Sequence, residues 1–156
     1  MSVRTLRAVV LPLALLAAST SAPAQDGAVV LTSKAPFGMM VATLERAVAE
    51  QQMTLVCRAN AQQGAAARGV RIPGNQVFMV FRNDFAVRLI NAEPRAAYEA
   101  PIRLYIHENP DGTATLVYVK PSTLFRPYGH PEVAKVAAEL DPIVDRIAAQ
   151  AVAARP

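Results

Sequence analysis

Two stretches of the chain repeat apolar residues at the period of an α-helix. Residues 37–52 and 132–151 each carry one apolar stripe with three- and four-residue spacing, which predicts two amphipathic helices. The stripes consist of Phe37, Met40, Val41, Leu44 and Val48, and of Val133, Val136, Leu140, Val144, Ile147 and Ala151. Because Pro142 lacks a backbone donor, we expect a kink there, or a helix that restarts with Asp141 as its N-cap.

Other stretches follow the two-residue period of a strand. Residues 102–107 alternate between apolar and polar side chains, and residues 113–119 are rich in β-branched side chains. The turn residues 109–112 join them, which predicts a hairpin. The continuous apolar run 76–82 fits a central strand buried on both faces. Two shorter strands are expected at residues 28–33 and 53–58.

Shorter segments complete the expected element order. We expect a short helix over residues 61–68, a helical segment over 84–98 that is broken near Pro94, and a loop over 121–131. Amphipathic helices must bury one face, and one sheet with helices on one side satisfies both of the long ones. The sequence therefore predicts an α+β fold: a two-layer sandwich with a mixed or antiparallel sheet of about five strands.

The first 24 residues have the pattern of a secretory signal peptide. Arg4 and Arg7 precede a short apolar run over residues 8–18, and residues 22–24 form the small-x-small pattern that a signal peptidase accepts. The run is too short to span a bilayer, so we expect cleavage after Ala24, a periplasmic or secreted location, and no stable membrane anchor. Residues 25–156 then form one domain.

Charge narrows the partners that we expect. Cleavage removes two of the 16 lysines and arginines and none of the 12 acids, so the net charge of the chain falls from +4 to +2. The sequence contains no dense basic run, and we expect no nucleic-acid partner.

The single cysteine, Cys57, cannot form an internal disulfide. The alternation of Met53, Leu55 and Cys57 places its thiol on the apolar side of a strand, although an intermolecular or chemical role stays open.

Catalytic and cofactor motifs give no support for a specific reaction. The sequence has no G-x-S-x-G, H-E-x-x-H, C-x-x-C-H or G-x-x-x-x-G-K-[ST] pattern. A metal site needs several convergent ligands, and the methionines are explained better as core residues. We therefore assign no catalytic residue, no metal ligand and no cofactor.

Two surfaces remain as candidates for binding. Arg103, Tyr105 and His107 share the polar face of one expected strand, which meets solvent, a ligand or a second subunit. We take these three residues as the candidate dimer interface. Arg126 and His130 lie in the segment 121–131 among aromatic residues and prolines, which is typical of a recognition loop, although its aromatic residues could instead anchor it to the core.

Several segments together resemble the family known as domain of unknown function 302, in an exported form. The resemblance lies in the order and spacing of residues 37–48, 53–60, 67–73, 76–81, 100–104, 111–112 and 118–124. It implies a two-layer α+β domain that pairs as a homodimer, with no established activity. Asn60 stands where the family often has a histidine, so any metal or proton-transfer role of that histidine is lost here. Asn83 and Tyr118 fit the pattern and become candidate ligand-binding residues beside Arg126 and His130.

The sequence thus favours an exported domain that binds a small molecule or a protein of the cell envelope, and that forms a homodimer. One alternative is an enzyme with a small-molecule pocket near Asn83 and Tyr118. A structural subunit of the envelope is the other. A deep polar pocket would favour a ligand or catalysis, and a flat apolar patch would favour a protein partner.

Overall fold

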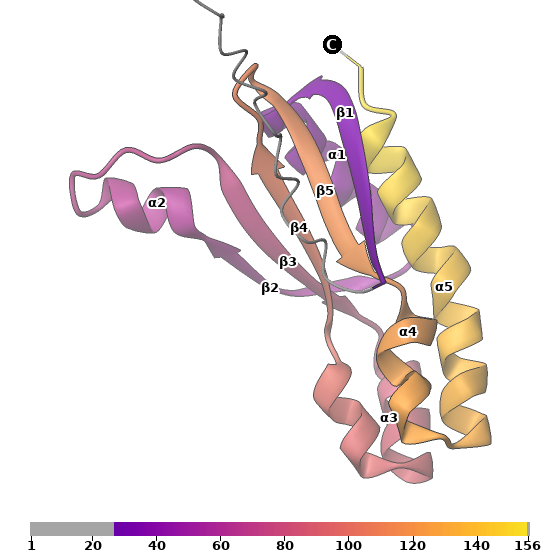
Figure 1. Cartoon of the computed structure of the whole chain (residues 1–156). Helices are drawn as coiled ribbons and strands as arrows, with labels where there is room; N and C mark the ends of the chain where they lie inside the picture. The colour runs from indigo at the N-terminus through magenta and orange to yellow at the C-terminus, as the bar shows by residue number, and fades with distance from the viewer. Residues whose placement is uncertain (1–26, 156) are drawn as a thin grey trace, which may run out of the picture.

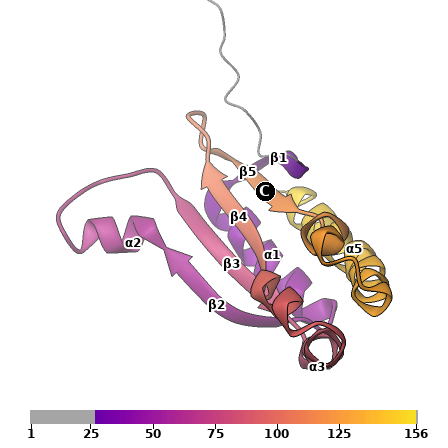
Figure 2. The same cartoon turned by 60° about the horizontal axis from the view of Figure 1, so that its bottom comes forward.

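A computed structural model describes residues 27–155, which form one antiparallel five-stranded sheet with helices on one side (Figures 1 and 2). The strand order is β1-β5-β4-β3-β2. The strands are β1 (Ala28–Pro36), β2 (Thr54–Asn60), β3 (Asn75–Phe81), β4 (Ile102–Glu108) and β5 (Thr113–Val119). The predicted α+β sandwich and the β4–β5 hairpin are confirmed, and the sheet is wholly antiparallel. The expected leader, residues 1–24, lies outside the described residues.

Two long helices cover one face of the sheet. They are α1 (Phe37–Glu50) and α5 (Pro131–Val152), and they also pack against each other. The predicted stripes face the core: Leu44 of α1 and Leu140 of α5 are fully buried, as are Leu104 and Leu116 on the facing strands. Burial of these apolar side chains is the main force that holds the layers together. Within residues 27–155, no helix combines the length and the apolarity needed to cross a bilayer.

Shorter helical segments gather at one end of the sheet, beside the first turns of α5 (Figure 1). They are α3 (Asn83–Ala92), α4 (Pro121–Phe125) and the 3₁₀ segments η1 (Pro94–Glu99) and η2 (Arg126–Tyr128). The break near Pro94 is confirmed, since α3 ends before it and η1 begins with it. The expected loop over 121–131 is wrong: Pro121 begins a helix, where its missing donor costs nothing, and Phe125 is buried beneath it.

Helix α5 runs without interruption through Pro142, so the expected restart at Asp141 is wrong. The Asp141 carboxylate does not cap α5. It accepts a 2.9 Å hydrogen bond from the backbone N–H of Ser122 at the start of α4. Leu140 and Val144 are fully buried on either side of Pro142, and this packing outweighs the one lost helical hydrogen bond.

A further expectation that fails concerns the strands β2 and β3. Strand β2 is an edge strand and Cys57 is exposed, so its assignment to the apolar core side is wrong. A bulge between Leu55 and Cys57 shifts the side-chain alternation, which places Cys57 beside Met79 on the side away from the helices. Strand β3 is not buried on both faces either: Phe78 and Val80 are buried, whereas Val77 and Met79 are only half-buried.

The far ends of β2 and β3 extend beyond the helical layer and carry the short helix α2 (Ala61–Ala66) (Figures 1 and 2). We call this extension, residues 58–75, the arm. Every residue of α2 is exposed or half-buried. The Asn60 side chain caps α2 by accepting a hydrogen bond from Gln63 N–H at 2.9 Å. The arm therefore contributes little to the core and presents its side chains to solvent.

Candidate functional site

The face of the sheet opposite α1 and α5 is the main candidate surface. Ile102, Leu104 and Ile106 of β4 are fully buried against the helices, so the intervening residues of the strand point to the opposite side. Those residues are Arg103, Tyr105 and His107. The strand alternation predicted from the sequence therefore holds, and it places these three side chains on the uncovered face.

Apolar side chains flank Tyr105 along one row across this face. Tyr105 pairs with Val77 of β3 on one side and with Val117 of β5 on the other, and Val117 pairs with Val30 of β1. Val30 is 52% exposed and Tyr105 is 36% exposed. Residues directly opposite in antiparallel strands lie on the same face, so these four form a continuous apolar strip. We call it the open-face strip.

A hollow of about 320 Å³ opens on this face where the sheet meets η1 and α4. We call it the face hollow. It is lined by Ala28, Val77, Glu99, Arg103, Tyr105, Val117, Tyr118, Val119 and Leu124. Residues of four strands, β1, β3, β4 and β5, form its floor, while Glu99 at the end of η1 and Leu124 in α4 form part of its rim. Most of its lining residues are apolar and only Glu99 and Arg103 are charged, as in small-molecule sites.

The two charged residues of the face hollow differ in their surroundings. No ion pair within residues 27–155 involves Arg103, which stands opposite Met79 in the β3–β4 ladder. The Glu99 carboxylate instead accepts a 3.1 Å hydrogen bond from the Tyr128 hydroxyl of η2. Burial and this hydrogen bond both raise the pKa of Tyr128, which keeps its donor proton in place. Among the described residues, the face hollow thus holds a cation without an ion-pair partner, Arg103, and an anion that already has a hydrogen-bond partner, Glu99.

The four candidate ligand residues from the sequence do not line a common hollow. Asn83 begins α3 and borders a groove of about 200 Å³ beside β2, whereas His130 borders another surface hollow with Arg88 and Glu132. Arg126 is exposed on η2. Only Tyr118 borders the face hollow, and its phenol points to the opposite side, toward α5. A ligand role for these residues stays a prediction.

Two of these four residues, His130 and Tyr118, make hydrogen bonds within the fold. The Nδ1 atom of His130 accepts a 3.2 Å hydrogen bond from the Glu132 N–H and thereby caps α5. The Tyr118 hydroxyl donates a 2.6 Å hydrogen bond to Asp145, whose second carboxylate oxygen lies 2.7 Å from Lys120 Nζ. Burial and the bond to Asp145 raise the pKa of Tyr118, so the phenol stays protonated and is poorly suited to act as a base.

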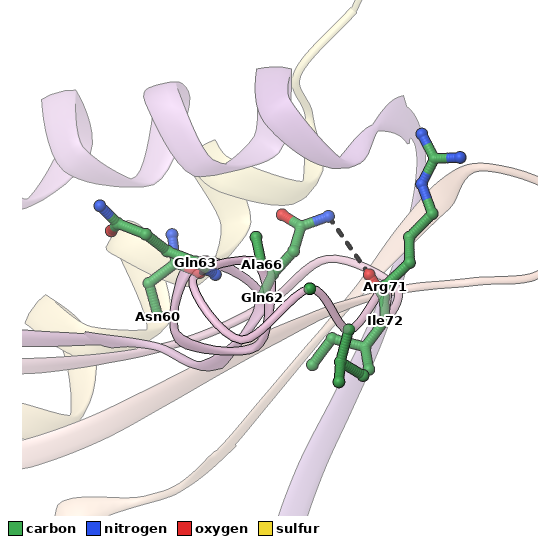
Figure 3. A pocket seen from close by; sticks show the side chains of 8 residues that line it. Asn60, Gln62, Gln63, Ala66, Arg71 and Ile72 are labelled. Carbon is green, nitrogen blue, oxygen red and sulfur yellow. Dashed lines mark hydrogen bonds between the residues drawn. The ribbon is translucent and has the colours of Figure 1, made fainter.

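A second, wider hollow of about 530 Å³ lies on the arm, between α2 and residues 69–72 (Figure 3). The amide of Gln62 is committed to the arm itself, because its Nε2 donates a 3.4 Å hydrogen bond to the carbonyl of Ile72. In Figure 3 the Arg71 side chain points away from Asn60 and Gln63. The polar groups of this arm hollow therefore do not converge, and it is the weaker candidate.

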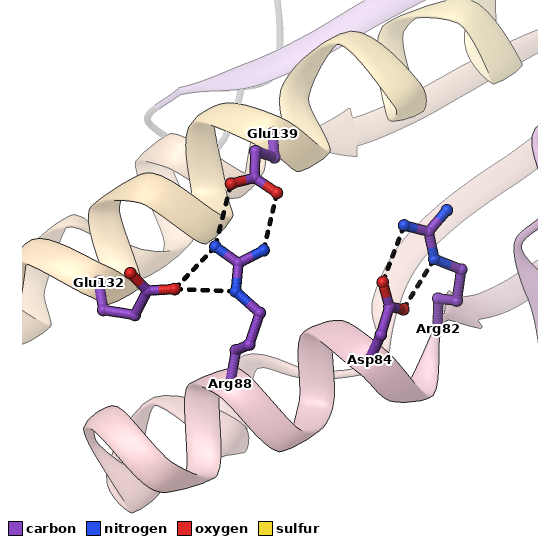
Figure 4. A network of polar contacts seen from close by, with 5 residues as sticks. All are labelled: Arg82, Asp84, Arg88, Glu132 and Glu139. Atoms are coloured by element: carbon purple, nitrogen blue, oxygen red, sulfur yellow. Dashed lines mark hydrogen bonds and ion pairs between the residues drawn. The ribbon is translucent and has the colours of Figure 1, made fainter.

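An ion-pair network links α3 to α5 (Figure 4). Arg88 donates to Glu132 at 2.8 Å and to both oxygens of Glu139, while Arg82 forms a bidentate pair with Asp84, two residues further along the chain. These carboxylates all face arginines, which makes them poor cation ligands. Among residues 27–155, no group of three histidine, cysteine or acidic side chains is placed to hold a metal ion.

The sequence did not indicate six of the residues that line the face hollow: Ala28, Val77, Glu99, Val117, Val119 and Leu124. Val77 and Val117 belong to apolar strands, and nothing in a single strand tells which of its faces a helix covers. The number of predicted elements did indicate that one face stays open, because two long helices packed side by side cover only one face of a five-stranded sheet. Glu99 and Leu124 come near the strands only through the tertiary fold.

Comparison with known proteins agrees with this fold. The family model described as "Domain of unknown function DUF302" matches residues 29–151. The crystal structure of an uncharacterized conserved DUF302 protein from Bacillus stearothermophilus superposes with a TM-score of 0.70 at 14% sequence identity, covering 80% of this chain and 98% of that one. Among curated proteins, none matches this chain. Since the family model spans most of the sequence, the chain belongs to the DUF302 family, whose function is unknown.

Proposed function

We propose that this DUF302 domain is an exported binding protein that takes a small molecule in the face hollow. The observation that carries the proposal is the combination of an apolar strand floor with Arg103, which forms no ion pair within residues 27–155, on a face that no helix of these residues covers. A volume of about 320 Å³ falls at the lower end of the range of small-molecule sites, roughly 300–1,000 Å³. The ligand is accordingly small.

Export rests on the sequence of the leader. Its positively charged start, apolar run and Ala22-Pro23-Ala24 ending support removal by a signal peptidase in the cell envelope. Intact-mass measurement of the exported protein should give a chain that begins at Gln25. A mature protein that retains Arg4 would contradict this part of the proposal.

Native mass spectrometry of the protein purified from its own cell envelope tests the binding function most directly. A small molecule retained by the native protein should be lost from a Val117→Glu variant, which places a charge in the floor of the face hollow. Ala134→Glu, on the exposed side of α5, is the matched control and should retain it. Equal retention by both variants would place the bound molecule elsewhere.

A homodimer through the same face is the second candidate, and the exposed open-face strip favours it. Val30 and Tyr105 leave substantial apolar area in contact with solvent, and an uncovered antiparallel face can pair with its own copy. In a two-fold interface each substitution acts twice, so Tyr105→Glu should yield monomers in sedimentation experiments. Ala134→Glu is again the control. If Tyr105→Glu leaves a dimer intact, the dimer uses another surface.

A further inference from the structure

We propose that the face hollow selects a monoanion: a carboxylate attached to a small apolar body. This inference rests on the proposed binding function and names the chemical class of its ligand. It follows from the positions of Arg103 and Glu99 and from the side chains around them.

Arg103 supplies the group that recognises the carboxylate. It projects from the middle of the sheet, between Met79 of β3 and the end of β5, and no ion pair satisfies it within the described part of the chain. A guanidinium beside apolar side chains gains most from a planar anion that accepts two parallel hydrogen bonds. A carboxylate has this geometry. An ammonium ion would instead be repelled by Arg103.

Glu99 restricts the ligand to a single negative charge. Its carboxylate lies on the rim of the same hollow and is fixed there by the hydroxyl of Tyr128. A dianion would place its second charge near this carboxylate, and like charges in a partly desolvated site disfavour binding. The pair therefore attracts one carboxylate at Arg103 and disfavours a second anionic group.

The apolar part of the lining determines the rest of the ligand. Val77, Val117, Val119 and Leu124 offer no side-chain hydrogen bond, and the ring of Tyr105 adds an aromatic surface beside them. At roughly 30 Å³ for each water-sized group, the hollow holds about ten such groups. This limit fits a benzoate-sized molecule. We expect a ligand of that size to bind with a dissociation constant of about 0.1–1 mM.

Three probes of nearly equal shape test the inference: sodium benzoate, benzamide and benzylamine, which are anionic, neutral and cationic. Each is titrated into the ¹⁵N-labelled protein while the backbone amides of β3, β4 and β5 are followed by NMR. We expect benzoate to bind at least about five times more tightly than benzamide, and benzylamine to bind most weakly of the three.

The charged residues should act in opposite directions. Arg103→Gln should weaken benzoate binding about tenfold and leave benzamide unchanged, whereas Glu99→Gln should strengthen benzoate binding about twofold to threefold. Arg46→Gln is the matched control, because Arg46 is exposed on α1, on the other side of the sheet, and does not line the face hollow. The amide spectrum of each variant also reports whether it is folded.

Two results would overturn the proposal, and they are distinguishable. If benzylamine binds most tightly, or if Arg103→Gln leaves benzoate binding unchanged, the monoanion assignment is wrong although the hollow still binds small molecules. If none of the probes shifts the amides around the hollow up to about 20 mM, well above the expected dissociation constant, the proposed function itself fails.

Discussion

The hydroxyl of Tyr118 lies 2.6 Å from Oδ1 of Asp145 and joins strand β5 to helix α5. Lys120 Nζ lies 2.7 Å from the other oxygen of the same carboxylate. Burial by itself would raise the pKa of Asp145, but the hydrogen bonds from Lys120 and Tyr118 outweigh burial and lower it. The contact therefore stabilises the helix layer, on the side of the sheet away from the face hollow.

Replacing Tyr118 by Phe removes this hydrogen bond and keeps the ring. Because Tyr118 is only 4% exposed and its partner is charged, we expect Tyr118→Phe to lower the free energy of unfolding by about 1–2 kcal/mol at pH 7. Urea denaturation measures the change. Tyr98→Phe is the control: Tyr98 is 87% exposed, and its hydroxyl should contribute less than about 0.5 kcal/mol. If both variants lose the same free energy of unfolding, the Tyr118–Asp145 hydrogen bond does not stabilise the protein.

The raised pKa of Tyr118 also predicts how stability depends on alkaline pH. Burial is the first cause of the shift and the Asp145 bond is the second. The folded protein holds the phenol proton at pH values where the unfolded chain has begun to release it. The contribution of the Tyr118 phenol to the free energy of unfolding is therefore fully present below the unfolded pKa of about 10. It falls as the pH rises toward the higher folded pKa. This fall should be smaller in Tyr118→Phe, and an identical fall in both proteins would contradict the assignment.

Glu93 should titrate at unusually acidic pH. Hydrogen bonds from the Arg95 side chain and from its backbone lower the pKa of Glu93 to about 2. Since the folded pKa is lowered, the stabilisation from Glu93 is present above the unfolded value of about 4.3 and is lost as the pH falls toward 2. Carboxyl chemical shifts followed by NMR report this titration directly.

The variant Arg95→Gln should raise the pKa of Glu93 from about 2 toward its ordinary value, while the backbone N–H of residue 95 still donates to the carboxylate and keeps the pKa below that value. Arg68→Gln serves as the control, because Arg68 is exposed beyond the end of α2 and takes no part in the Glu93–Arg95 contact. If Glu93 titrates at the same pH in Arg95→Gln as in the unmodified protein, the Glu93–Arg95 contact does not form in solution.

The architecture was predictable because its signals are local. Phe37, Met40 and Leu44 repeat at helical period, and the turn 109–112 separates two strand patterns, so α1 and the β4–β5 hairpin can be placed from the sequence alone. The helical segment at Pro121 was missed because five residues give too few periods to detect.

The candidate site was less predictable because it depends on tertiary placement. Arg103 and Tyr105 were assigned correctly to one strand face, since strand alternation fixes that relation. Val77 was expected in a doubly buried strand, because an apolar run looks the same whether or not a second layer covers it. Glu99 reaches the face hollow from η1, and no pattern within its own segment shows this.

Cys57 should react readily in the native protein. It lies on the exposed edge strand β2, after a bulge that places it away from the helices. A water-soluble maleimide should therefore label the folded chain at nearly the rate of the urea-unfolded chain. Because the thiol contributes little to the core, Cys57→Ser should change the free energy of unfolding by less than about 0.5 kcal/mol. Labelling that requires unfolding would show that another surface covers β2 in solution.

Phe37 gives a matched pair of tests, because it lies next to Gly38 in α1 and packs against Gly74 before β3. A Cβ atom at Gly74 would lie 2.6 Å from two carbons of the Phe37 ring, whereas a Cβ atom at Gly38 would meet nothing within 4 Å. Neither glycine needs a positive φ, so the two positions differ in space rather than in backbone strain.

We expect Gly74→Ala to destabilise the protein by about 1–3 kcal/mol, because the ring must move out of a packed contact. Gly38→Ala should stabilise it by about 0.4–1 kcal/mol, since alanine restricts the unfolded chain and suits a helix. Urea denaturation of both variants measures the difference. If Phe37→Leu removes the penalty of Gly74→Ala in a double-mutant cycle, the ring is its cause. A Gly74→Ala variant as stable as the unmodified protein would show that Phe37 and Gly74 are not in contact in solution.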